Sequence, residues 1–215
     1  VAEALEMLDE LEEEWTAPDV ADEPHPTVAR RGSTLLSGRF RVIGRLGSGS
    51  TALALLVRDR DQADRDCVLK VALQPSLNSR IEAEAGALGR FEEPHPSTIV
   101  RLLDGPIEID GLATLVLSYA GFKQDIERAE REPSDDSAEI VRGERTLSAR
   151  IGDPSSVELV ERFGDDLLDA VNELDEAGVF HRDIKPGNLA LTMRGPKDAL
   201  HLVLFDFSLA SAPLD

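Results

Sequence analysis

Residues 180–189 read FHRDIKPGNL and concentrate polar side chains between apolar neighbours. Asp183, Lys185 and Asn188 place a carboxylate, an ammonium and an amide within six residues. A second carboxylate, Asp206, follows the apolar segment LVLF. An exposed turn would explain either stretch alone. Together, however, two acidic oxygens and an amide oxygen form a set of hard ligands that suits Mg²⁺.

Two features further upstream indicate an anionic ligand. Gly47 and Gly49 lie in the segment RLGSGSTALALLV, in a turn predicted between two strands. Glycines let backbone N–H groups approach an anion closely, although a plain hairpin turn has the same composition. Lys70 lies in the apolar strand VLKVA, where it needs an anionic partner unless it reaches solvent from a sheet edge. Glu84 is the first candidate for that partner and Glu82 the second. Oxygen ligands, a glycine turn and a buried lysine together predict a metal–nucleotide site.

The elements that position these residues are short strands and one helix in the first half of the chain. Apolar segments separated by turn residues predict five antiparallel strands, at residues 40–46, 52–57, 67–72, 97–103 and 112–119. Residues 79–91 carry apolar side chains on one face and glutamates beside them, which predicts a helix. These elements would form a first lobe.

The second half is predicted to be helical before it returns to strands. Residues 122–145 hold thirteen charged side chains in twenty-four, which favours an inserted, partly ordered loop. Apolar periodicity over residues 157–177 predicts a long amphipathic helix that Gly178 ends. Two strands follow, at 188–192 and 200–206, so the polar stretch at 180–189 lies between a helix and a hairpin.

The sequence resembles the eukaryotic-type Ser/Thr protein kinases, because four of their motifs occur in the right order. These motifs are the glycine segment, the strand with Lys70, residues 180–189 and the segment with Asp206. The resemblance implies an α+β, protein-kinase-like fold, with a five-stranded antiparallel N-lobe and the first part of a helical C-lobe. The implied organisation is an acidic N-terminal helix and linker over 1–37, an N-lobe and hinge over 38–120, and a partial C-lobe over 121–215.

The resemblance also implies a role for each polar residue in ATP- and Mg²⁺-dependent transfer to a protein hydroxyl. The loop over the ATP phosphates would comprise Gly47, Ser48, Gly49, Ser50 and Ala52. Lys70 would contact the α- and β-phosphates while pairing with Glu84. The adenine would lie against the hinge residues, namely the gatekeeper Leu117 with Ser118 and Ala120. Asp183 would orient the substrate hydroxyl, Lys185 would neutralise the transferred group, and Asn188 and Asp206 would hold Mg²⁺.

A narrower resemblance comes from GVFHRDIKPGNLAL and LVLFDFSLASAPLD, which are similar to the PglW-like kinases of phage growth limitation and BREX systems. Ser208 replaces the glycine of the family's D-F-G motif, and Ala52 replaces its third loop glycine. The chain ends nine residues after Asp206, so a truncated C-lobe and further domains of a longer protein are expected. Two alternatives stay open: a nucleotide-binding scaffold without transfer activity, and a small-molecule phosphotransferase, a class that tends to lack a lysine at the position of Lys185.

Composition limits the partners. The chain has 215 residues and a formal net charge of −19, which argues against direct nucleic-acid binding. No apolar run reaches the roughly 18 residues of a membrane-spanning helix. Residues 1–24 carry ten acidic and no basic side chains, which predicts a short acidic amphipathic helix before a linker. The single Cys67 cannot form an internal disulfide, and a cytoplasmic protein acting on a protein substrate is expected.

Overall fold

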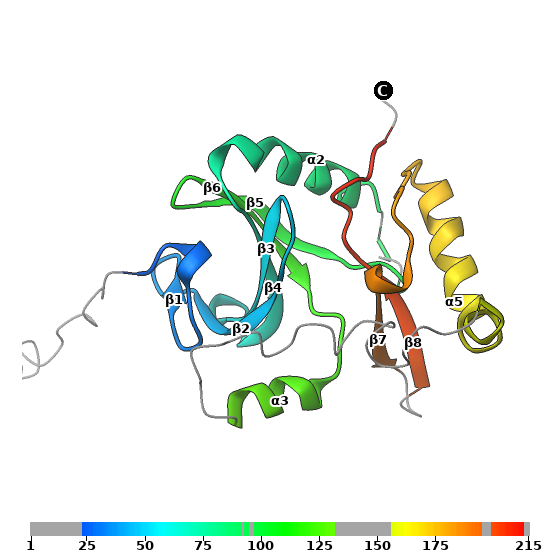
Figure 1. Cartoon of the computed structure of the whole chain (residues 1–215), viewed down its shortest axis with the longest axis horizontal. Helices are drawn as coiled ribbons and strands as arrows, with labels where there is room; N and C mark the ends of the chain where they lie inside the picture. The colour runs from blue at the N-terminus through cyan, green and yellow to red at the C-terminus, as the bar shows by residue number, and fades with distance from the viewer. Residues whose placement is uncertain (1–22, 92, 95–96, 132–155, 195–198, 213–215) are drawn as a thin grey trace, which may run out of the picture.

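The computed structural model describes residues 23–91, 93–94, 97–131, 156–194 and 199–212. Its first half is a curled antiparallel sheet in the order β1-β2-β3-β4-β6-β5, with helix α2 packed against it (Figure 1). The strands are β1 (Thr34–Leu35), β2 (Phe40–Ser48), β3 (Ala52–Asp59), β4 (Arg65–Ala72), β5 (Leu102–Ile109) and β6 (Leu112–Ser118). Apolar residues of β3, β4 and β6 are buried on both faces, which explains their nearly continuous apolar sequences. The same burial raises the pKa of the Cys67 thiol to about 12, with nearby Asp59 acting in the same direction.

The sheet has six strands, so the expected count of five was one too few. The additional strand β1 is only two residues long and pairs with the start of β2, where Leu35 lies opposite Phe40. Such a short strand carries no alternating pattern, which is why the sequence did not reveal it. The 3₁₀ turn η1 (Pro26–Val28) precedes it, and Glu23 accepts hydrogen bonds from the backbone N–H groups of Ser37 and Gly38. The helix expected within residues 1–24 lies outside the described residues, apart from the last two.

Helix α2 (Asn78–Leu88) follows the 3₁₀ turn η3 (Pro75–Leu77) and confirms the helix predicted there. It ends three residues earlier than expected, with Gly89 as its C-cap. The Asn78 side chain fixes its first turn to the β5–β6 hairpin. It donates to the Gly111 carbonyl and accepts from the Ala113 N–H, both at 2.9 Å. Glu84 lies on the buried face of α2.

Residues 123–131 form helix α3 (Lys123–Arg131), where a loop was expected. Phe122 and Ile126 are both buried, and their spacing of four residues supplies the apolar contact that a short helix needs. Residues 122–145 carry thirteen charged side chains, so this single apolar pair was too weak a pattern to predict a helix from the sequence. The rest of the expected charged loop, residues 132–145, lies outside the described part of the chain.

The C-terminal half contains the long helix α5 (Ser156–Glu176) beside the hairpin of β7 (Leu189–Arg194) and β8 (Ala199–Leu204) (Figure 1). All three elements were predicted. Gly178 has a φ of +62°, a left-handed conformation that ends the helix without strain on a side chain. None of the helices in the described residues is both long enough and apolar enough to cross a membrane.

The two halves meet along a short backbone connection, in a segment where a strand of the first lobe was expected at 97–103. Only the last two residues of that segment belong to β5; Ile99 instead forms an isolated parallel bridge with Leu204 of β8. Val100 donates to the Leu204 carbonyl at 2.9 Å, and Leu204 donates to the Thr98 carbonyl at 2.8 Å. This bridge sets β8, and therefore Asp206 just after it, against the end of the sheet.

Candidate active site

A pocket of about 540 Å³ lies where the sheet meets the C-terminal half. Its volume is within the roughly 300–1,000 Å³ of small-molecule sites in proteins. The residues of the predicted site that line it are Gly47, Ser48, Gly49, Ser50, Ala52, Lys70, Leu117, Ser118, Ala120, Asp183, Lys185 and Asp206. The remaining two, Glu84 and Asn188, are buried and hydrogen-bond to residues that line it.

The glycine segment forms the β2–β3 hairpin at one end of the pocket. β2 continues through Ser48, so the turn comprises residues 49–51. Gly47 therefore lies in the strand, whereas the sequence analysis placed it in the turn. The Gly49 N–H donates to the Ala52 carbonyl at 2.9 Å. A Cβ atom at Gly47 would have nothing within 4 Å, so the fold itself does not require a glycine there. The glycine leaves open space beside the backbone that an anionic ligand can occupy.

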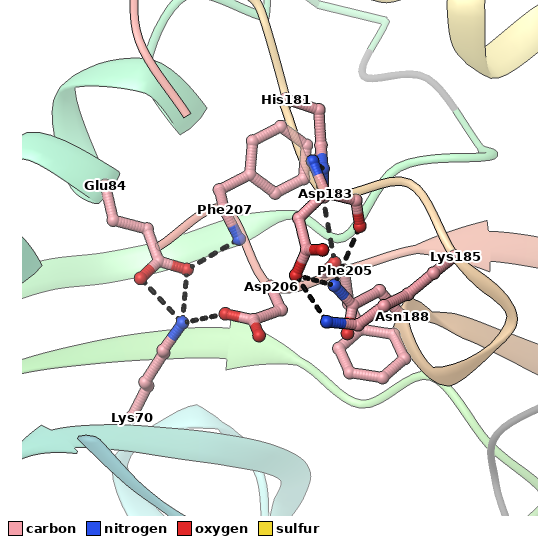
Figure 2. A network of polar contacts seen from close by, with 9 residues as sticks. All are labelled: Lys70, Glu84, His181, Asp183, Lys185, Asn188, Phe205, Asp206 and Phe207. Carbon is pink, nitrogen blue, oxygen red and sulfur yellow. Dashed lines mark hydrogen bonds and ion pairs between the residues drawn. The ribbon is translucent and has the colours of Figure 1, made fainter. Parts of the chain in front are cut away.

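Lys70 is the central cation of the site, and Figure 2 shows it between two carboxylates. Its Nζ lies 2.7 Å from Glu84 and 2.8 Å from Asp206. Lys70 comes from β4, Glu84 from α2 and Asp206 from the segment after β8, so the contact joins three elements. The predicted pairing of Lys70 with Glu84 is present, and Glu82 is exposed, as its position on another face implies. Burial raises the pKa of Glu84, and the nearby ammonium of Lys70 opposes that rise.

Asp206 has a φ of +66°, a left-handed conformation that is uncommon for residues other than glycine. Burial alone would raise its pKa, but Lys70 and hydrogen bonds from Ser208 outweigh burial and lower the pKa below its usual value. The next residue, Phe207, is fully buried, and its N–H donates to Glu84 Oε1 at 3.1 Å. Asp206 is therefore held as an ionised carboxylate that faces the pocket.

Asp183, Lys185 and Asn188 form a second polar group across the pocket (Figure 2). Lys185 Nζ lies 2.7 Å from Asp183 Oδ2, and Asn188 Nδ2 donates to the same oxygen at 2.9 Å. The hydrogen bond from Lys185, followed by that from Asn188, lowers the pKa of Asp183. The 3₁₀ turn η4 (Pro186–Asn188) returns the chain so that Asn188 meets Asp183. The carboxylate is thus ionised and oriented by two donors.

His181 supports this loop from behind. Its Nε2 lies 3.2 Å from the Phe205 carbonyl, and its Nδ1 accepts from the Asp183 N–H at 3.3 Å. This pattern requires the neutral ring with its proton on Nε2, and burial lowers the His181 pKa in agreement. The ring also packs edge-on against Phe207, with 4.6 Å between ring centroids. His181 is accordingly a structural residue that supports the loop through these contacts.

The apolar end of the pocket lies at the hinge. Leu117 is buried and pairs with Val68 across β4 and β6. Leu46, Val68 and Val100 also line the pocket, and the sequence analysis did not select them. Arg80 was missed as well, although it lies one helical turn before Glu84 and therefore on the same side of α2. That spacing was the available signal.

The oxygen donors fit a magnesium ion bound together with a phosphate ligand. The Asn188 amide nitrogen is engaged by Asp183, which leaves the amide oxygen as an acceptor, and Asp206 lies nearby as a carboxylate (Figure 2). Among the described residues, no three His, Cys, Asp or Glu side chains lie close enough together to hold a metal ion by themselves. Mg²⁺ commonly takes only one or two protein ligands, with phosphate and water completing its shell. The donor set therefore suits a metal that arrives with a nucleotide.

No protein family model matches the chain, but it is similar in sequence to several known proteins. The probable kinase PglW of Streptomyces coelicolor is 37% identical over 99% of this chain and 14% of its own length. The serine/threonine-protein kinase PksC of the same organism is 26% identical over 76% of this chain and 27% of its own length. Calcium/calmodulin-dependent protein kinase type IV of Homo sapiens is 25% identical over 80% of this chain and 31% of its own length.

The chain thus spans less than a third of each of these relatives. It is nevertheless similar to protein kinases along most of its own sequence. The resemblance to protein kinases, and the narrower one to PglW, is confirmed.

Proposed function

We propose that this chain is the catalytic part of an ATP- and Mg²⁺-dependent protein serine/threonine kinase, which transfers the γ-phosphoryl group of ATP to a protein hydroxyl. The observation that carries the proposal is the contact of Lys70 with both Glu84 and Asp206, inside a pocket that also contains Asp183. A binding module has no need to retain an oriented carboxylate opposite the phosphate end of its pocket.

Phosphoryl transfer requires positioning and charge neutralisation more than covalent chemistry. In the proposed arrangement the adenine lies against Leu117, Ser118 and Ala120, and the phosphates lie beneath the hairpin at residues 47–52. Lys70 binds the α- and β-phosphates, and Glu84 keeps its ammonium in place. Asn188 and Asp206 would hold Mg²⁺, which supplies positive charge to the β- and γ-phosphates when it is bound.

Asp183 is proposed to orient the attacking hydroxyl, because its carboxylate is ionised and held by Asn188. Lys185, which contacts Asp183 at 2.7 Å, would neutralise charge on the transferred group. Specificity for serine and threonine is supported by Lys185 and by the similarity to the serine/threonine-protein kinase PksC.

The biological setting is part of the same proposal. The chain matches only 14% of the length of PglW, which supports a segment of a longer, multidomain protein. A role in bacterial phage defence is proposed from the resemblance of its motifs to the PglW-like kinases. The substrate would be a protein, and the cytoplasm is the proposed compartment because ATP is the donor.

A nucleotide-binding scaffold without transfer activity is the second candidate. Ala52 and Ser208 favour it, because each replaces a glycine of the kinase motifs. A phosphotransferase acting on small molecules has less support, since Lys185 contacts Asp183 where that class tends to lack a lysine.

Substitution of Asp183 by asparagine tests the proposal. Transfer of ³²P from γ-labelled ATP to casein should fall by at least about 100-fold, because an amide cannot accept the proton of the attacking hydroxyl. ATP affinity should stay within about twofold, because the side chain keeps its size and its hydrogen bond from Asn188. Asp169→Asn, on the exposed face of α5, is the matched control.

Transfer by the Asp183→Asn variant at the wild-type rate would contradict the catalytic assignment. A wild-type chain that binds ATP but labels neither itself nor casein would favour the scaffold. Labelling of small alcohols or aminoglycosides instead of protein would favour the small-molecule enzyme.

A further inference from the structure

Three of the described residues that line the pocket are cationic, and Arg80 is the one to which the site has so far given no role. Lys70 lies between two carboxylates, and Lys185 contacts Asp183 at 2.7 Å (Figure 2). Arg80 is exposed and makes no hydrogen bond or ion pair with any of the described residues. The pocket therefore has one cation whose charge no described side chain neutralises.

Arg80 belongs to the polar end of the pocket. It lies in the first turn of α2, one helical turn before Glu84, so both side chains are on the same side of the helix. From that side Glu84 reaches Lys70, at 2.7 Å. The apolar end is lined instead by β6 and the hinge, which contribute Leu117 and Ala120. Arg80 is thus on the side of the pocket where the proposed phosphates lie.

The helix itself gives no reason for a cation at this position. The N-terminal turn of a helix carries partial positive charge, which disfavours an arginine there. The first turn of α2 has no acidic side chain that would offset it. Glu84 has the spacing of an i,i+4 ion pair with Arg80, but it is buried and engaged by Lys70 and the Phe207 N–H. An exposed, unpaired arginine therefore stands where the stability of the helix would favour an acidic residue.

A phosphate ligand would supply the missing counter-charge. The two lysines of the pocket face three carboxylates, so without Arg80 this end carries a net negative charge when all five groups are ionised. A triphosphate stays negative with Mg²⁺ bound and would be repelled by that charge. Arg80 makes this end neutral, and a guanidinium can donate two parallel hydrogen bonds to one phosphate group.

We propose that Arg80 is a phosphate-binding residue that contacts the γ-phosphoryl group of ATP. The inference deepens the proposed function and rests on it, because it assumes that the nucleotide occupies this pocket. Lys70 is largely buried and is already proposed for the α- and β-phosphates. Arg80 is exposed, and the γ-phosphoryl group must also lie towards solvent if the hydroxyl of a protein substrate is to reach it. Arg80 would therefore make the pocket prefer a triphosphate to a diphosphate.

The affinities of ATP and ADP, both measured with saturating Mg²⁺ by isothermal titration calorimetry, test the inference. Arg80→Gln should weaken ATP binding about tenfold, because charge-assisted hydrogen bonds to the γ-phosphoryl group are lost. ADP lacks that group, so its affinity should stay within about twofold of the wild-type value. Arg80→Lys keeps the charge but not the two-pronged geometry, and should restore ATP affinity to within about threefold of the wild type.

Arg41→Gln is the matched control, because Arg41 is an exposed arginine of β2 that does not line the pocket. It makes the same change in net charge and should leave both affinities within about twofold of the wild type. All these variants should fold like the wild type, because each replaced side chain is exposed. Equal weakening of ATP and ADP binding in Arg80→Gln, as a general electrostatic effect would give, overturns the inference, and so does an unchanged ATP affinity.

A wild-type chain that binds neither ATP nor ADP would overturn the proposed function, and the role of Arg80 with it. A wild-type chain that binds ATP with an affinity that Arg80→Gln leaves unchanged would overturn the role of Arg80 alone. The two failures are therefore distinguishable.

Discussion

At the residue scale, the site depends on a balance of charge around one lysine. Lys70 is largely buried, and only 1% of the Glu84 side chain is exposed to solvent. Removing one partner of a buried ion pair leaves the other charge without compensation, which is more costly than the pair is stabilising. Lys70 therefore serves the fold as well as the pocket.

Lys70→Met should separate these two roles. It should weaken ATP binding at least tenfold, because the phosphates lose their cation, and it should destabilise the chain by about 3–5 kcal/mol at neutral pH. Burial already raises the pKa of Glu84 in the wild type, and loss of Lys70 raises it further. The folded state then binds a proton that the unfolded state releases above about pH 4.5, so stability should fall as the pH rises from there.

Urea unfolding between pH 5 and 8 measures this dependence. The double variant Lys70→Met/Glu84→Gln should recover much of the lost stability at pH 8 without recovering ATP binding. Equal destabilisation of Lys70→Met at pH 5 and pH 8 would contradict the charge balance described here.

Sequence reasoning identified Lys70 and Glu84 together because an apolar strand with one lysine demands an acidic partner on the next helix. It did not identify the contact of Lys70 with Asp206, because the two residues are 136 positions apart and no local pattern joins them. For the same reason it missed the hydrogen bond from the Phe207 N–H to Glu84. The residue types were predictable, whereas the network that holds them required the fold.

At the scale of elements, helix α2 connects the sheet to the polar centre of the site. Asn78 joins its first turn to the β5–β6 hairpin, and Glu84 joins its middle to Lys70 and Phe207. These contacts fix the helix at two points along its length. The position of Glu84 therefore depends on Asn78, six residues earlier.

Asn78→Ala should destabilise the chain by about 1–3 kcal/mol, because two hydrogen bonds are lost. Hydrogen exchange should accelerate in the first turn of α2 and at the Ala113 amide, which loses its acceptor. Ser79→Ala, at the exposed neighbouring position, should change stability by less than about 0.5 kcal/mol. Unaltered exchange at Ala113 in the Asn78 variant would contradict this anchoring role.

Elements with a strong apolar pattern were predictable, and short ones were not. The helix over 156–176 and strands β3, β4 and β6 have long apolar patterns, and all were anticipated. β1 has two residues, and α3 has one buried isoleucine among charged side chains, so neither had enough periodicity to detect. β1 is stabilised by its pairing with the start of β2, and α3 by contacts with a distant part of the chain, such as the ion pair between Arg58 of β3 and Glu130 of α3.

At the scale of the whole molecule, the pocket exists because the two halves are joined at several points. The backbone bridge between Ile99 and Leu204 and the ion pair between Lys70 and Asp206 both cross this boundary. The order of the motifs along the sequence predicted that the halves would meet around a nucleotide. The structure brings residues of these motifs together around one pocket, and the nucleotide stays a prediction. The bridge at Ile99 was not predictable, because its apolar neighbours indicated an ordinary strand of the sheet.

The most direct test of the account is the thermal unfolding midpoint of the chain with ATP, with and without Mg²⁺, beside Lys70→Met and Asp206→Asn. Ligand at about 100 times its Kd adds about 2.7 kcal/mol, which is about 5–10 °C for a chain of this size. The account predicts a Mg²⁺-dependent rise of this order in the wild type and its loss in both variants, each compared with its own midpoint without ligand. A midpoint that does not respond to ATP and Mg²⁺, or an equal response in all three proteins, would contradict a metal–nucleotide site at Lys70 and Asp206.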